Sequence, residues 1–142
     1  MIINATDTKE LFRKKIPKKY LEYLKERKVV SEEYLDSLKN GIFGILEENV
    51  LFIENKPFCV ECFLGASNDD VYDIIRSNEL FELEPQKGTA FAVLYGDDFL
   101  YFKPDDTKVY YFNRIDNTSV CIAESYNSLI GLIKMEENDE NE

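Results

Sequence analysis

The chain has 142 residues and a formal net charge of −11. Hydrophobic residues make up 44% of it, with 10 Phe and 9 Tyr, so there is enough apolar material for one core and an intrinsically disordered chain is excluded. Histidine is absent, which excludes Ser-His-Asp and Cys-His catalysis and every metal site that contains histidine.

Two further features concern location. No stretch approaches the roughly 18 apolar residues that a membrane-spanning helix requires. The N-terminal stretch MIINATDTKELFRKK lacks the apolar region of a signal peptide, and three cysteines do not make a disulfide framework. We therefore expect a cytoplasmic protein that has no contact with membranes.

The charge is unevenly distributed along the chain. Residues 1–28 contain nine Lys and Arg against four Asp and Glu, a net charge of +5, which leaves −16 for the other residues. Such a negative field repels nucleic acid and speeds the encounter with a basic protein partner. Solubility alone is an equally good explanation of the charge.

Helices are predicted for the first forty residues. Asp7 and Glu10 have the spacing of a capping box and begin a short helix over 7–12. Pro17 begins a second helix, and Ser31 caps a third, SEEYLDSLK, which ends at Asn40-Gly41. The apolar face of the second helix consists of Tyr20, Leu21 and Leu24.

Strands are predicted from Ile42 onward. The stretch ILEENVLFIENKPFCVECF contains two strands joined by Glu54-Asn55-Lys56-Pro57. A helix follows, capped by Ser67 with Asp70 three residues later, and its apolar stripe consists of Val71, Ile74, Ile75 and Leu80.

The second half of the chain is rich in aromatic and β-branched residues. TAFAVLY, DFLYFK and KVYYFNR are separated by acidic turns and predict an antiparallel meander, followed by a weaker strand at 120–122 and a closing helix, SYNSLIGLIK. The predicted fold is α+β, with N-terminal helices, a mainly antiparallel sheet of about five to six strands interrupted by a helix, and a C-terminal helix. We expect a single domain over residues 1–135 and a disordered acidic tail at 136–142.

The spacing of the cysteines does not predict a zinc site or a redox site. Cys59 and Cys62 have C-x-x-C spacing, but only Cys121 is available as a further thiolate, and residues three apart in a strand face opposite sides of the sheet. Buried or incidental cysteines are the preferred interpretation, with a metal or redox role as the alternative.

Three aspartate pairs lie where turns and helix starts favour aspartate: Asp69-Asp70, Asp97-Asp98 and Asp105-Asp106. A divalent cation between paired carboxylates is the alternative. No calcium loop, P-loop or dinucleotide-binding motif occurs, so we expect neither a metal nor another cofactor.

The order of these motifs resembles the SUKH superfamily. Members begin with a helix of the form L-P-x-x-Y-x-x-F/Y-L. The stretch IPKKYLEYL at 16–24 is similar to this form. Further on, AFAVLY, Gly96-Asp97, FLYFKPDD, KVYYF at 108–112 and AESYNSL at 123–129 follow the order of the family. The resemblance covers residues 16–133.

This resemblance implies a binding protein and not an enzyme, because SUKH domains include a yeast cell-wall-synthesis regulator and many bacterial immunity proteins that neutralise toxins. For this chain it implies an immunity protein whose acidic surface blocks a basic toxin domain, such as a nuclease. The predicted partner-binding residues are Asp69, Asp70, Asp97, Asp98, Asp105 and Asp106, with Tyr101 and Tyr110 as exposed contacts beside them.

Two alternatives remain open. A regulatory or scaffold module would bind a host protein or a small ligand without any toxin. A metal-dependent enzyme would use the paired aspartates.

Overall fold

The computed structural model describes residues 17–39, 50–53, 56–67 and 69–131. The predicted helix at 7–12, the predicted helix end at 40–41 and the predicted acidic tail at 136–142 lie outside the described residues.

Two of the predicted N-terminal helices are confirmed. Helix α2 (Lys18–Glu26) follows Pro17, and helix α3 (Glu32–Lys39) follows Ser31, whose Oγ accepts a hydrogen bond from the Tyr34 amide at 3.3 Å. The predicted apolar face of α2 is wrong at Leu21, which is 46% exposed. Tyr20 and Leu24 are buried, and Tyr23 packs beside them against the core, whereas Leu21 lies on the outer side of the helix.

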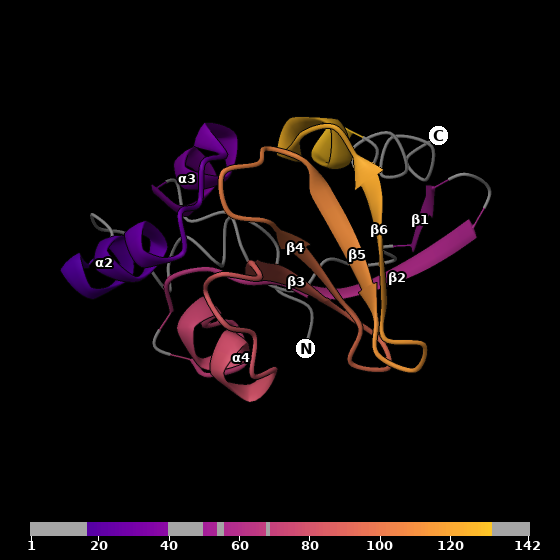
Figure 1. The fold of residues 1–142 in the computed structure, drawn as a ribbon, viewed down its shortest axis with the longest axis horizontal. Helices are drawn as coiled ribbons and strands as arrows, with labels where there is room; N and C mark the ends of the chain where they lie inside the picture. The colour runs from indigo at the N-terminus through magenta and orange to yellow at the C-terminus, as the bar shows by residue number, and fades with distance from the viewer. Residues whose placement is uncertain (1–16, 40–49, 54–55, 68, 132–142) are drawn as a thin grey trace.

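The strands form one antiparallel meander in sequence order (Figure 1). They are β1 (Val50–Ile53), β2 (Lys56–Phe63), β3 (Thr89–Leu94), β4 (Phe99–Phe102), β5 (Val109–Asn113) and β6 (Thr118–Ala123). Lys56 and Pro57, predicted as part of a turn, begin β2, where they pair with Ile53 and Phe52. Helix α4 (Ile74–Leu80) separates β2 from β3.

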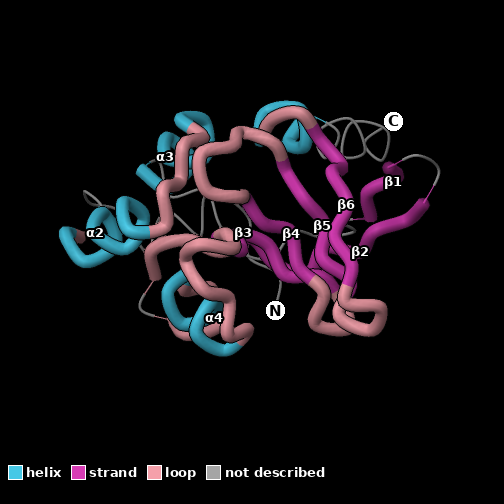
Figure 2. The backbone as a smooth tube through the Cα atoms, viewed as in Figure 1, coloured by secondary structure: helices cyan, strands magenta, loops and turns pink. Residues whose placement is uncertain are grey.

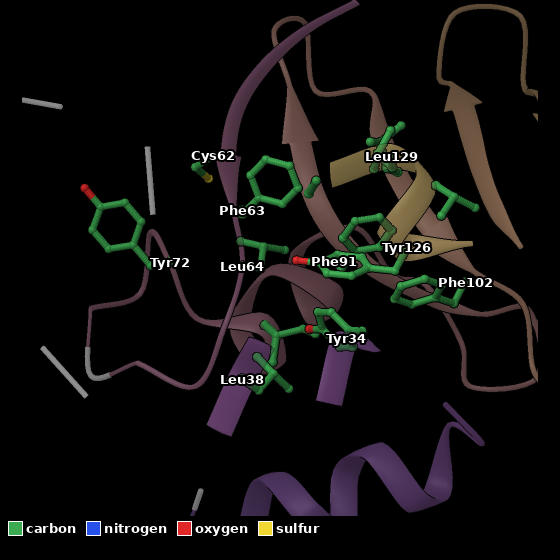
Figure 3. Close-up of a cluster of buried hydrophobic side chains, with 14 of the residues drawn as sticks. Tyr34, Leu38, Cys62, Phe63, Leu64, Tyr72, Phe91, Phe102, Tyr126 and Leu129 are labelled. Carbon is green, nitrogen blue, oxygen red and sulfur yellow. The ribbon is translucent and has the colours of Figure 1, made fainter. Parts of the chain in front are cut away.

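The main core lies between the sheet, helix α3 and the helical residues 126–131 that follow β6. Its centre consists of the rings of Tyr34, Phe91, Phe102 and Tyr126, which come from all three parts of this layer (Figure 3). Phe91 and Phe102 stack with centroids 4.3 Å apart, and Tyr126 meets Phe91 edge-on at 5.5 Å. Aromatic pairs of this kind add about 1 kcal/mol each to the burial of their area.

A second, smaller cluster occupies the other face of the sheet. Ala90, Phe99 and Tyr101 are buried there, and Phe81, Leu83, Tyr110 and Phe112 pack against them. Strand β4 is therefore buried on both faces, since Leu100 and Phe102 belong to the main core. The segment 81–88 that joins α4 to β3 covers part of this second face.

Helix α4 is shorter than the sequence pattern predicts. It begins after Asp73, whose side chain caps it by accepting from the Arg76 amide at 3.1 Å, and not after Ser67. The backbone of Gly65 exchanges hydrogen bonds with Tyr72 and Ile74 at 2.8 and 2.9 Å, which holds the residues before Ile74 out of a helix. The predicted apolar stripe is consequently wrong at its ends: Val71 is 58% exposed and Leu80 is 66% exposed.

Buried hydrogen bonds fix α4 and the segment after it to the sheet. The amide of Asn78 donates to Ala90 O at 3.0 Å and to Ile74 O at 2.8 Å, while its oxygen accepts from the Ala90 amide at 2.8 Å. Arg27 from the end of α2 donates to Leu83 O at 2.7 Å and to Gly88 O at 2.5 Å. Both ends of the 81–88 segment are thus anchored.

These elements make the chain an α+β protein with helices before and after an antiparallel sheet, as predicted (Figure 2). Strand β6 confirms the weak strand at 120–122 and is longer than expected. In the part of the chain that the structure describes, no helix has the length and apolar character needed to cross a bilayer.

The junction between α4 and β3 leads to a stability prediction. Replacing Asn78 with Ala leaves the Ala90 amide and carbonyl buried without partners, which lowers the free energy of unfolding by about 3 kcal/mol. Urea unfolding followed by circular dichroism measures the change. Glu79→Ala, at the next and exposed position of the helix, is the control and costs about 0.5 kcal/mol or less. Equal stability of the two variants would contradict the assignment.

Candidate protein-binding surface

The three aspartate pairs do not form a single surface. Asp97-Asp98 lies in the turn between β3 and β4, and Asp105-Asp106 in the connection from β4 to β5. Consecutive connections of an antiparallel meander lie at opposite ends of the sheet, which Figure 2 shows for these two. Asp97 and Asp98 therefore do not lie together with Asp105 and Asp106 on one part of the surface.

Two of the six carboxylates accept hydrogen bonds from β5 or the residues next to it: Asp98 ties the β3–β4 turn to this strand, and Asp106 fixes the connection that leads into it. Asp98 accepts hydrogen bonds from the Tyr111 hydroxyl at 2.8 Å and the Arg114 amide at 2.9 Å. Asp106 accepts from the Tyr110 hydroxyl at 2.6 Å and the Lys108 amide at 2.8 Å. The bond from Tyr110 lowers the pKa of Asp106 and raises the pKa of Tyr110 to about 12.

Three of the other aspartates also serve the turns that contain them. Asp69 accepts from the Val71 amide at 3.0 Å. Asp97 and Asp105 adopt left-handed backbone conformations, with φ of 66° and 64°, which short polar residues tolerate in turns. Asp97 pairs with Arg114 at 3.6 Å and Asp105 with Lys28 at 3.8 Å, and all four side chains of these pairs are largely exposed. Asp69, Asp97 and Asp105 thus lie in turns, whereas the helix start predicted at Asp69-Asp70 is wrong, since α4 begins after Asp73.

Neither predicted tyrosine is freely exposed. Tyr101 is 6% exposed, and its hydroxyl donates to Ser119 Oγ at 2.7 Å. The expectation of an exposed contact is wrong for Tyr101, because this side chain belongs to the cluster on the second face of β4. Tyr110 is half-buried and directs its hydroxyl to Asp106.

One groove does bring predicted residues from different pairs together. It has a volume of about 200 Å³ and lies between β2, β3 and α4. The carboxylates at it belong to Glu61, Asp70 and Asp97, which come from three separate segments. Its apolar lining consists of Val71, Leu80, Phe81 and Val93. We call this site the acidic groove.

The sequence pattern did not indicate Glu61 as a site residue, because it lies inside an otherwise apolar strand. The pairing of β2 with β3 is irregular between Val60 and Cys62, which pair with Leu94 and Val93. A bulge of this kind redirects a side chain, so that both Glu61 and Cys62 line the groove. Simple alternation along a strand does not reveal it.

The cysteines behave as strand residues. Cys59 is exposed and Cys62 is buried. Burial raises the pKa of the Cys62 thiol to about 12, so this thiol stays protonated at neutral pH. Among the described residues, no three His, Cys, Asp or Glu side chains are placed to share a metal ion.

Comparison of this chain with models of protein families, with curated proteins and with solved structures finds no match. The relation to the SUKH superfamily accordingly stays a prediction from the sequence motifs.

The bond between Tyr110 and Asp106 leads to a prediction about pH. Tyr110→Phe removes it and moves the pKa of Asp106 upward, toward the ordinary value of an aspartate, in a carbon-detected NMR titration. Because the folded-state pKa is lowered, the bond stabilises the fold above the ordinary pKa, and this contribution is lost as the pH falls through the lowered value. Tyr95→Phe, at an exposed position, is the control. An unchanged titration of Asp106 in Tyr110→Phe would contradict the assigned cause.

Proposed function

We propose that this chain is a binding protein that holds a basic protein partner at the acidic groove. The observation that supports the proposal is the convergence of Glu61, Asp70 and Asp97 beside two exposed apolar side chains, Val71 and Leu80. The more specific form of the proposal is an immunity protein that neutralises a toxin domain, which the resemblance to the SUKH superfamily implies.

The groove combines the two features that protein interfaces use. Val71 and Leu80 offer apolar area to an aliphatic or aromatic side chain of the partner, and burial of such area contributes about 25 cal/mol per Å². The carboxylates around them favour Arg and Lys on either side of that side chain. A partner that presents an apolar residue between basic residues therefore matches the groove.

The charge of the whole chain acts in the same direction. A net charge of −11 attracts a basic domain over distances of about a Debye length, before any contact forms. A basic nuclease is a suitable partner, since the positive field that gathers its substrate also gathers an acidic inhibitor. The association rate is consequently expected to fall steeply as salt is added.

Asp97 is available to the partner despite its contact with Arg114. The pair spans 3.6 Å, and the side chains of Arg114 and Asp97 are 54% and 72% exposed. Exposed pairs of this kind are worth less than about 1 kcal/mol, so an arginine of the partner can replace Arg114 at little cost.

The test is the double charge reversal Glu61→Lys and Asp70→Lys. With the product of the gene adjacent to that of this chain as the candidate toxin, the double variant is expected to lower the association rate at low salt by about tenfold or more, measured by stopped-flow fluorescence. It also loses protection of cells that produce the toxin.

The matched control is the double reversal Asp36→Lys and Glu124→Lys, which changes the net charge by the same amount at exposed positions on other elements. If both doubles slow association equally, the charge of the whole chain acts and the acidic groove does not. If the wild-type protein neither binds nor protects, the immunity function is wrong.

A further inference from the structure

A second and larger groove lies on the other side of Phe81, the residue at which α4 ends. It has a volume of about 660 Å³ and lies between the 81–88 segment and the second face of β4, β5 and β6. Aromatic rings line it: Phe99 stacks on Phe81 at 4.7 Å and on Phe112 at 4.9 Å, and Tyr101 lies beside Phe99 at 5.7 Å. We call this site the aromatic groove.

The charges at the aromatic groove are opposite to those of the chain as a whole. Its lining includes three cations, Lys87, Lys103 and Arg114, and a single carboxylate, Glu82. Lys103 lies 4.2 Å above the Tyr110 ring, Arg114 has only its exposed pair with Asp97, and Lys87 has no ion pair within the described residues. All three cations are exposed.

The aromatic groove is preformed, because the segment that covers it is fixed to the rest of the fold. Arg27 fixes the 81–88 segment through its bonds to Leu83 O and Gly88 O, and Asn78 fixes Ala90 just after the segment. At Gly88 the backbone passes so close to Tyr101 and to Phe102 O that a side chain has no room, and φ is +145°. Because this segment does not have to be ordered when a ligand binds, the entropic cost of binding is smaller.

We propose that the aromatic groove binds an acidic segment of a partner protein. One aromatic or large aliphatic side chain of the segment packs on the half-buried rings of Phe81 and Phe112, and flanking carboxylates pair with Lys87, Lys103 and Arg114. Complementary charge supports this choice, because a cationic site in a strongly acidic chain attracts a short acidic segment locally. This inference does not depend on the acidic groove.

Single-stranded nucleic acid fits the groove less well, although bases also stack on aromatic rings. A strand carries phosphates along its whole length, and these meet the net charge of −11 beyond the three cations. The turns at Asp97 and Asp105 lie at the two ends of the same strands and add to the repulsion.

The experiment uses labelled short peptides as probes, with fluorescence anisotropy for affinity and amide shifts in NMR for location. The peptide Asp-Glu-Phe-Glu-Asp is expected to bind with shifts at Lys87, Lys103 and Ser119. Its Ala-centred analogue is expected to bind about tenfold more weakly, because it lacks the ring. The Lys-flanked peptide Lys-Lys-Phe-Lys-Lys is expected not to shift these amides.

Variants give the second part of the test. Lys87→Glu with Lys103→Glu weakens binding of the acidic peptide by about tenfold or more, while Lys18→Glu with Lys25→Glu, the same charge change on exposed positions of α2, leaves it within about twofold. Urea unfolding confirms that each variant is folded. Glu61→Lys with Asp70→Lys retains the acidic peptide, so that failure at one groove is distinguished from failure at the other.

Three results would overturn the proposal. The first is equal affinity for the Phe-centred and Ala-centred peptides, and the second is equal loss in the two lysine variants. The third is that oligothymidylate binds more tightly than the acidic peptide and that the double variant Lys87→Glu, Lys103→Glu loses the binding of oligothymidylate. This result would assign the groove to nucleic acid.

Discussion

The side chain of Asn78 joins α4 to β3, and the surfaces on both sides of α4 depend on this junction. Its amide and oxygen satisfy both the carbonyl and the amide of Ala90, a residue with no exposed surface. Leaving such buried groups unpaired is costly, so α4 has one position relative to the sheet. The cap at Asp73, which is itself hydrogen-bonded by the Tyr20 hydroxyl from α2, fixes where the helix begins.

With α4 fixed, Phe81 at its end separates two grooves of opposite charge. The acidic groove lies between α4 and β2, where Asp70 and Glu61 lie, and the aromatic groove lies under the 81–88 segment. Arg27 holds that segment through the carbonyls of Leu83 and Gly88.

Local sequence patterns predicted the elements but not how they meet. Capping by Ser31 and the aromatic strands followed from short-range rules, whereas the start of α4 depended on backbone bonds from Gly65, which no local pattern encodes. The order of the strands in the meander places Asp98 and Asp106 at opposite ends of the sheet. The position of Glu61 in a groove could not be predicted, because it depends on a bulge in β2. The aromatic groove could not be predicted either, because the 81–88 segment that covers it has no regular sequence pattern.

Hydrogen exchange at the Ala90 amide tests the junction most directly, since this amide donates to the side-chain oxygen of Asn78. If α4 is held as described, the amide exchanges only when the whole protein unfolds, as slowly as the Leu64 amide, which bonds to Phe91 O at 2.8 Å. Exchange of Ala90 as fast as that of the exposed turn residue Gly96, in protein whose Leu64 stays protected, would show that α4 detaches and that the grooves are not preformed.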